Sequence, residues 1–455
     1  MKIRIIGGGL AGSEAALTAA RLGCTVDLYE MRREEAGELH LSPAHETTAL
    51  AELVCSNSLK SESPNTAPWL LKQEMRRAQS ALMALADETA VPAGHALAVD
   101  RVLFAERVTQ TIAAEPRITL HREEVTSLAD DPEAAVTILA SGPLTSEALS
   151  RSLTELTGTD GLAFFDSIAP IVEADSINLD KAYFAARWDK GGADYLNCPM
   201  EREEYDIFYE ALLAAESAGG HDWDKAEYFE GCLPIEVLAS RGRDTLRYGP
   251  MKPVGLRNPR TGKTPWAVVQ LRKENQRADS YNLVGFQNHL KFGDQARVLK
   301  LIPGLEDAHF LRFGQIHRNT YICAPKLIDS TLRLKEKSGQ PLLFAGQLSG
   351  IEGYTESIAT GLLAGIHAAQ IAQGREAIAA PRTSGLGSLV HYITAADAND
   401  FQPANMTFDL LEPLEEELRK KIRDKKERHR LQCERSLAAF DAWWAEINLK
   451  EIVQK

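Results

Sequence analysis

The chain has 455 residues, of which 44% are apolar and 25% are charged, and its formal net charge is −13. A chain of this length exceeds the size at which one hydrophobic core stops growing, so two or three domains are expected, and the composition excludes a fibrous or disordered protein. The negative charge excludes indiscriminate binding to nucleic acids, which requires clustered cations, so any nucleic-acid site must be local.

The sequence also argues against membrane, secreted and metal-binding classes. No apolar run reaches the roughly 18 to 20 residues that cross a bilayer, and the first residues lead straight into a glycine cluster rather than a signal peptide. The six cysteines are scattered without a C-x-x-C pair, which indicates neither a zinc site nor a disulfide framework. We therefore expect a cytoplasmic protein with free thiols and no metal.

The chain opens with a β-α-β pattern. An isoleucine-rich run over residues 2–7 predicts a strand, residues 12–22 predict a helix with small residues on one face, and residues 25–30 predict a second strand. Such a unit belongs to a parallel sheet that later strands complete. Between strand and helix stands a G-x-G-x-x-G turn.

This turn has the residues that dinucleotide binding requires. Gly7 permits a tight turn, Gly9 lets the backbone approach a pyrophosphate, and Gly12 lets the helix pack closely on the strand. The helix amino end presents free N–H groups and a positive dipole to the phosphates. We expect the nucleotide to be held by these glycines and by four further residues. Glu30 would accept hydrogen bonds from the ribose hydroxyls, and Leu10, Ala11 and Arg32 would be further contacts of the nucleotide. A glycine turn that binds nothing is the alternative.

The next elements are a long loop over residues 32–51, helices over 69–87 and from 100 to 112, and strands at 118–121 and 135–139. Between about 165 and 300, aromatic and polar residues are mixed with Gly and Pro turns, which indicates an inserted domain. Residues 341–346 then predict a buried strand and residues 355–369 a helix. The last 45 residues have Glu, Lys and Arg at helical spacing, and their run 420–430 is either an RNA contact or a solvated helix face.

These elements predict an α/β protein with a Rossmann-like FAD-binding domain and an inserted smaller α/β domain. The FAD-binding domain is split between residues 1–165 and 301–375, the insertion covers 166–300, and a C-terminal helical segment covers 376–455. A second glycine turn at a helix amino end favours FAD over NAD, because it can hold a flavin ring or its ribityl chain. Its candidate contacts are Gly346, Gln347, Gly353 and Tyr354; a plain strand-to-helix connection is the alternative.

Two cysteines and one basic segment are candidates for RNA chemistry. Cys55 lies between an apolar pair and a polar turn, and Cys232 lies between a glycine and a proline that shape the backbone. A thiolate can add to C6 of uracil and make C5 nucleophilic, whereas a buried thiol is inert. Residues 240–263 hold seven basic residues and one acidic residue, so they either grip RNA phosphates or form a solvated loop. The cations that we expect to contact RNA are Arg241, Arg243, Arg247, Lys252 and Arg257.

Several long sequence motifs occur in a fixed order over nearly the whole chain. They include AELVCSNS at 51–58, YLNCPM at 195–200, FEGCLPIE at 229–236, YGPMKPVGL at 248–256 and the segment 344–354. With the opening turn, they make the chain similar to the folate- and FAD-dependent tRNA uracil methyltransferase family (TrmFO, formerly Gid), which methylates C5 of the T-loop uridine. One departure is Cys323, which stands where that pattern has asparagine.

The resemblance implies an enzyme with FAD as cofactor, NADPH or NADH as reductant, methylenetetrahydrofolate as one-carbon donor and tRNA as substrate. It implies that Cys232 attacks uracil and that Cys55 assists in proton transfer or protects the flavin. Two alternatives are the same chemistry on ribosomal RNA, and an RNA-binding protein that keeps FAD without turnover.

Overall fold

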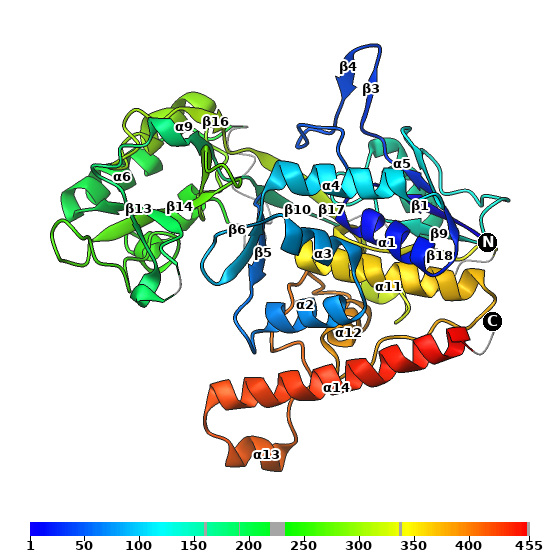
Figure 1. Cartoon of the computed structure of the whole chain (residues 1–455). Helices are drawn as coiled ribbons and strands as arrows, with labels where there is room; N and C mark the ends of the chain where they lie inside the picture. The colour runs from blue at the N-terminus through cyan, green and yellow to red at the C-terminus, as the bar shows by residue number, and fades with distance from the viewer. Residues whose placement is uncertain (159–161, 191, 219–232, 336–338, 453–455) are drawn as a thin grey trace.

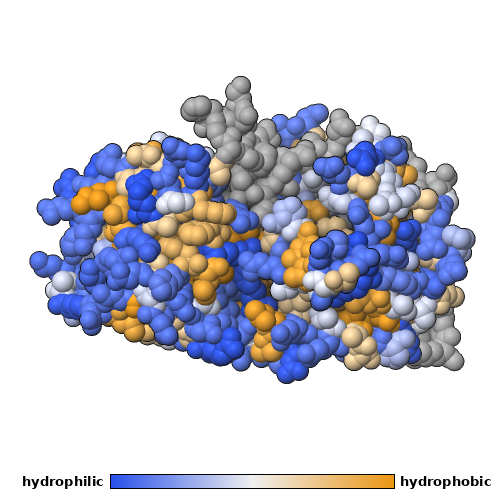
Figure 2. Space-filling view, turned by 90° about the horizontal axis from the view of Figure 1, so that it is seen from above, coloured by the Kyte–Doolittle hydropathy of each residue, from blue (hydrophilic) through white to orange (hydrophobic). Residues whose placement is uncertain are grey.

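The computed structural model describes residues 1–158, 162–190, 192–218, 233–335 and 339–452, with no side-chain description at 162–167, 316–318 and 448–452. Figure 1 shows two lobes, with both chain ends on the larger one. Polar surface covers most of the face in Figure 2 and is interrupted by apolar patches on both lobes. Within the described residues, no helix combines the length and the apolar character that a bilayer crossing requires.

A five-stranded parallel sheet forms the centre of the larger lobe. Its strands stand in the order β18-β9-β1-β2-β8, and every neighbouring pair is parallel. The strands are β1 (Lys2–Ile6), β2 (Thr25–Tyr29), β8 (Ile118–His121), β9 (Val136–Leu139) and β18 (Leu342–Phe344), so the five predicted strands are confirmed. The strand order reverses between β1 and β9, and open parallel sheets bind ligands at such a reversal.

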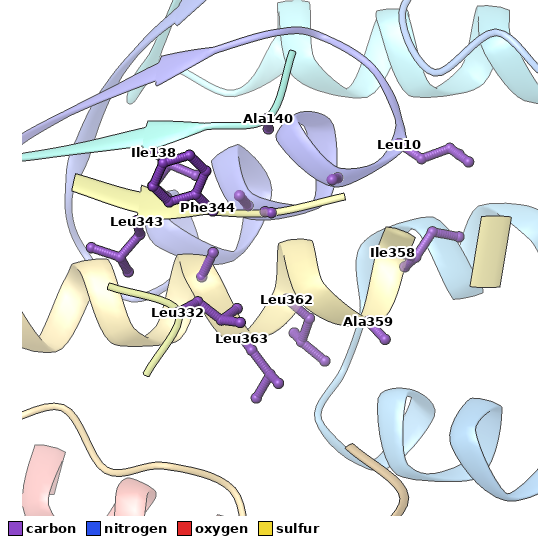
Figure 3. Close-up of a cluster of buried hydrophobic side chains, with 14 of the residues drawn as sticks. Leu10, Ile138, Ala140, Leu332, Leu343, Phe344, Ile358, Ala359, Leu362 and Leu363 are labelled. Carbon is purple, nitrogen blue, oxygen red and sulfur yellow. The ribbon is translucent and has the colours of Figure 1, made fainter. Parts of the chain in front are cut away.

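Helices α1 (Leu10–Arg21) and α11 (Tyr354–Ala372) lie side by side against this sheet (Figure 1). A Cβ atom at Gly361 would lie 2.3 Å from the carbonyl oxygen of Ala11, and one at Gly365 would lie 2.8 Å from that of Ala15. The backbones of α1 and α11 therefore approach so closely that no side chain larger than a hydrogen atom fits at positions 361 and 365. Figure 3 shows the core next to them, where Phe344 of β18 lies above Leu362 of α11.

Two predicted elements differ from the structure. The single helix over 69–87 is wrong, because α2 (Ala67–Arg77) and α3 (Ala81–Glu88) are separated by a turn in which Gln79 has a positive φ of 59°. Buried Glu14 accepts a hydrogen bond of 2.9 Å from the Leu82 amide and so caps the second helix. The loop over 32–51 contains an antiparallel hairpin, β3 (Arg33–Glu35) and β4 (Glu38–His40).

The remaining elements of the larger lobe surround the sheet. A small antiparallel sheet stands in the order β5-β7-β6, and the other helices include α14, which packs on α2. These elements are β5 (Ser58–Ser61), β6 (Ala90–Val91), β7 (Ala96–Val99), α4 (Arg101–Ala114), α5 (Glu147–Thr157), α10 (Ala324–Leu327), η5 (Gln347–Ser349), α12 (Gly385–Ala395), α13 (Glu416–Lys421) and α14 (Lys425–Ile452).

The second lobe is an α/β insertion with a core of its own, which extends from Val172 to Ala308. Its sheet has the order β12-β13-β14-β15-β11-β16, and the paired strands β10 (Leu162–Ser167) and β17 (Ile316–Tyr321) connect the lobes. Its elements are β11 (Ile171–Glu173), η1 (Ala174–Ser176), β12 (Tyr183–Ala185), η2 (Arg187–Asp189), β13 (Tyr195–Met200), α6 (Arg202–Leu213), α7 (Ile235–Ser240), α8 (Thr245–Tyr248), β14 (Ala267–Lys273), β15 (Ser280–Leu283), α9 (Phe292–Leu299) and β16 (Phe310–Arg312).

Candidate functional site

A cleft of about 1180 Å³, partly open to solvent, lies at the carboxyl ends of the parallel strands. Its walls come from segments that are far apart in the sequence: the first glycine turn, the end of β2, the loop before β5, the loop after β9 and the second glycine turn. Of the predicted site residues, the cleft is lined by Gly7, Gly9, Leu10, Ala11, Glu30, Arg32, Cys55, Gly346, Gln347 and Tyr354.

The three glycines of the first turn differ in what requires them. A Cβ atom at Gly7, whose φ is +107°, would lie 2.3 Å from the carbonyl oxygen of Ala140, and one at Gly12 would lie 1.8 Å from that of Gly7. Packing of the protein therefore excludes side chains at both positions. A Cβ atom at Gly9 would meet nothing within 4 Å, and its φ of −73° suits any residue. Gly9 lines the cleft, so its missing side chain leaves room for a group that binds there, as a pyrophosphate would.

The amino end of α1 borders the same space. Its first turn holds no acidic residue, and no side chain of the described chain caps it at Gly9. The N–H groups of this turn and the positive end of the helix dipole are therefore available to an anion in the cleft.

Glu30 and Arg32 form a buried charged group beside the turn. The Glu30 carboxylate accepts hydrogen bonds from the Gly8 amide at 3.0 Å and from Nε of Arg32 at 2.9 Å. Burial opposes the ionisation of Glu30, but the Arg32 guanidinium outweighs it and holds the pKa of this carboxyl below its ordinary value. Glu52 contacts the other side of Arg32 at 3.2 Å. Two carboxylates therefore flank one guanidinium at this end of the cleft.

The second glycine turn packs against the start of α1, next to the first glycine turn. Gly346 has a φ of +75°, and a Cβ atom there would lie 2.9 Å from the Cβ atom of Ala11. The Gly346 amide donates to Oγ1 of Thr360 at 2.9 Å, and Nε2 of Gln347 donates to Glu352 at 2.6 Å. Gly353 is the N-cap of α11. The two predicted glycine turns therefore meet at one site.

Cys55 lies in this cleft and is held through its backbone. The Cys55 amide donates to Oη of Tyr354 at 2.6 Å, and the Ser56 amide donates to the same oxygen at 3.3 Å. Burial and the nearby Cys55 raise the pKa of Tyr354 well above its ordinary value, so the phenol stays neutral. Tyr354, predicted as a cofactor contact, also fixes the segment that carries the thiol.

Arginines that sequence reasoning missed hold the same segment. Arg101 of α4 and Arg312 of β16 both donate to the Val54 carbonyl, at 3.0 and 3.1 Å. Burial opposes the charge of Arg101, but Glu274, Tyr354 and Cys55 outweigh it and raise its pKa. Two guanidinium groups therefore stand next to the residue that precedes Cys55.

A third arginine fixes the residues that follow Cys55. Nε of Arg272 donates to Oδ1 of Asn57, and its Nη2 donates to Oγ of Ser56, both at 2.8 Å. Asn57 also donates to the carbonyl of Lys273 at 2.9 Å. None of these three arginines was assigned to the site from the sequence, because their contacts form between segments that are far apart in the chain.

Two of the predicted RNA contacts, Arg243 and Arg247, are not among the residues that line the cleft. Cys232 lies in the stretch 219–232, outside the described residues, so its role as the thiolate that attacks uracil stays a prediction. Arg243 forms ion pairs with Asp206 and Glu210, at 2.6 and 3.1 Å. Arg247 pairs with Asp244 at 2.6 Å and lies 3.5 Å from the centre of the Trp266 ring.

The three other predicted RNA contacts, Arg241, Lys252 and Arg257, have exposed side chains. Among the described residues, no three His, Cys, Asp or Glu side chains come together as a metal site.

Comparisons with known proteins agree on one family. The model of the family "Glucose inhibited division protein A" matches residues 2–376. Proteins named "Methylenetetrahydrofolate–tRNA-(uracil-5-)-methyltransferase TrmFO" from Koribacter versatilis and Solibacter usitatus are 61% and 57% identical to this chain over 445 and 446 residues. The alignments cover 98% and 97% of this chain and 98% of each relative.

The fold is similar to a solved structure as well. GidA of Aquifex aeolicus superposes with a TM-score of 0.69 at 16% identity, covering 98% of this chain and 73% of that one. At this identity the likeness concerns the fold alone.

Proposed function

The chain belongs to the glucose-inhibited division protein A family, and from this premise we propose that it is a methylenetetrahydrofolate-dependent tRNA (uracil-5-)-methyltransferase with FAD as cofactor. The observation that carries this function is the identity of 61% over 98% of both chains to a relative with that name. The cleft supports it, because Cys55 and the two glycine turns line one space. The finer proposals are a T-loop uridine as target, NADPH or NADH as reductant and a cytoplasmic location.

The residues of the cleft fit FAD. Gly9 leaves room for the pyrophosphate, the α1 amino end offers N–H groups to it, and Glu30 offers an acceptor to the ribose. Gly346 and Gln347 stand where the flavin end would lie. Bound FAD, once reduced by the nicotinamide, would supply the electron pair that converts the transferred carbon to a methyl group.

The two cysteines divide the work on the uracil ring. The Cys232 thiolate adds to C6, which makes C5 nucleophilic toward the one-carbon unit; later loss of the C5 proton and departure of the thiolate restore the ring. Cys55 is the group beside the cofactor, and it moves a proton or shields the flavin. The hydrogen bond from its amide to Tyr354, and those from Arg101 and Arg312 to the carbonyl of the preceding Val54, keep its thiol at a fixed place in the cleft.

The RNA contacts are the cations of the segment 240–263. Lys252 and Arg257 are the strongest candidates, because neither forms an ion pair with any described residue. Arg241, Arg243 and Arg247 complete the proposed set, although the last two share their charge with acidic neighbours. A local site of this kind suits a molecule whose overall charge repels RNA.

A methylation assay tests this function. The purified protein is incubated with FAD, NADPH, methylenetetrahydrofolate labelled in its transferable carbon, and transcripts of either tRNA or ribosomal RNA. We expect label in 5-methyluridine of the tRNA T-loop, and only when folate and nicotinamide are both present. Label confined to ribosomal RNA would move the activity to that substrate, and no transfer with a bound flavin would leave a non-catalytic RNA-binding protein.

A further inference from the structure

Trp188 is an exposed aromatic residue of the insertion, and its backbone is unusual. It lies in η2, within the connection from β12 to β13, and its side chain is 64% exposed. Both Trp188 and Asp189 have positive φ values, 61° and 52°. Such conformations are uncommon for residues other than glycine and concentrate at functional positions. The fold thus holds a large apolar ring in solvent at some cost.

One face of the Trp188 indole is covered and the other is open. The Trp188 amide donates to the carbonyl of Gly255 at 2.7 Å. A Cβ atom at Gly255 would lie 2.8 Å from both Cε2 and Nε1 of the indole and 3.0 Å from Cδ1. Nearly equal distances to three ring atoms place Gly255 against the face of the ring rather than its edge. Since the side chain is 64% exposed, the opposite face is open to a ligand.

The loop beneath the ring is fixed and carries charge. Arg187 donates to the Val254 carbonyl at 2.7 Å and to Oε1 of Gln270, which anchors the two loops to each other. Lys252 and Arg257 stand three residues before and two residues after Gly255, with exposed side chains and no ion pair within the described chain. An open aromatic face next to a loop that carries exposed cations is the pattern of single-stranded nucleic-acid sites.

This aromatic loop also reaches the larger lobe. The Gly94 amide donates to Oδ2 of Asp194 at 2.8 Å, and Oη of Tyr195 donates to the carbonyl of Ala93 at 3.3 Å. The loop that carries Trp188 therefore ends at the junction between the lobes.

We propose that Trp188 is a stacking platform for an unpaired base of the tRNA substrate, with Lys252 and Arg257 on the adjacent phosphates. The proposal rests on the function proposed above and assigns to it a base contact outside the cleft. Every base offers a π face, and stacking on an aromatic residue contributes strongly to binding without reading the sequence. Stacking also adds affinity that the charge of this acidic protein does not provide.

Three variants of the full-length flavoprotein test the platform. Trp188→Ala removes the ring, Trp188→Phe keeps an aromatic face, and Ile207→Ala removes an apolar side chain of similar exposure, 61%, from α6 of the same lobe. We expect the Kd of Trp188→Ala for a tRNA transcript to rise about tenfold, with a matching rise in KM and an unchanged kcat. Trp188→Phe and Ile207→Ala should bind within about twofold of the parent, because stacking and the fold are kept.

Two further readouts separate stacking from charge and from misfolding. The dependence of Kd on salt should keep its slope in Trp188→Ala, whereas Lys252→Ala should lower the slope by about one. The fluorescence difference between the parent and Trp188→Phe reports on Trp188 itself, and we expect a T-arm stem-loop RNA to quench it.

An unchanged Kd in Trp188→Ala, or no quenching of the difference signal, would overturn the platform. Methylation of tRNA by the parent enzyme is measured first. Its absence would refute the proposed function, whereas normal tRNA binding by Trp188→Ala in an active enzyme would refute the platform alone.

Discussion

Replacing Gly9 by alanine separates the needs of the cofactor from those of the fold. A Cβ atom at Gly9 meets no protein atom within 4 Å and the φ of −73° accepts it, so the chain should still fold. Alanine is a poor N-cap, which costs at most about 1 kcal/mol, or about 2–4 °C in Tm. In the cleft, the new methyl group occupies the space of a close contact, and such overpacking costs about 1–3 kcal/mol. We therefore expect the Kd for FAD to rise about 5- to 150-fold.

Two matched substitutions frame this experiment. Gly293→Ala places a methyl group in equally open space on α9 of the insertion, far from the glycine turns, and should leave FAD binding unchanged. Gly12→Ala would place its Cβ atom 1.8 Å from the Gly7 oxygen and should prevent normal folding. FAD titration of the apoprotein, followed by flavin fluorescence, measures the affinities. Parent-like affinity in Gly9→Ala would refute a pyrophosphate at this turn.

Three further predictions concern the site. Cys232→Ala should keep the yellow flavin and lose methyl transfer, which is measured as transfer of label to tRNA. The control Cys24→Ala, at a buried residue with 1% exposure, should keep both the flavin and the activity. Full activity of Cys232→Ala would refute the nucleophilic role of Cys232. Burial lowers the pKa of His45 from 6.5 to about 4, so the unfolded chain binds its proton first and the free energy of unfolding should fall as the pH drops through this range. His45→Gln should flatten that part of the Tm-against-pH curve, and an unaltered curve would contradict the assignment. Arg101→Ala leaves the Glu274 carboxylate buried without its partner at 2.9 Å, so the free energy of unfolding in denaturant should fall by about 3–5 kcal/mol. The double variant with Glu274→Ala should recover part of this stability. If the losses of the two single variants simply add, the pair is not coupled.

The parallel sheet could be predicted because its signals are local. Each strand is a short apolar run, and the glycines at 7 and 12 meet backbone oxygens that come from the same β-α-β unit or its neighbouring strand. The break between α2 and α3 has one local signal, the N-cap Ser80, whose side chain accepts a hydrogen bond from the Met83 amide at 3.2 Å. Glu14, a buried carboxylate of α1 that lies 68 residues away, accepts a second hydrogen bond at the start of α3. Apolar spacing through the turn imitates one helix and hides the serine cap, and the tertiary contact could not be predicted.

The candidate site was predictable in part: its motif residues could be found in the sequence, but the residues that orient them could not. Cys55 and the two glycine turns belong to sequence motifs, and all three line the same cleft. The hydroxyl of Tyr354 under the Cys55 amide and the arginines around Val54 were not predictable, since these contacts join residues up to 299 positions apart. Sequence patterns find residues that carry chemistry, whereas the residues that orient them depend on packing.

The contacts around Cys55 come from both lobes, so the insertion helps to build the cleft. Arg272 and Arg312 stand on strands of the inserted sheet, and Arg101 stands on a helix of the larger lobe, yet all three hold residues 54–57. The proposed role of Cys55, between a flavin and a uracil, requires that its thiol be held in a fixed position. Because each lobe supplies part of that support, a shift of one lobe against the other moves the sulfur. The arrangement of the lobes therefore affects where the Cys55 sulfur lies in the cleft.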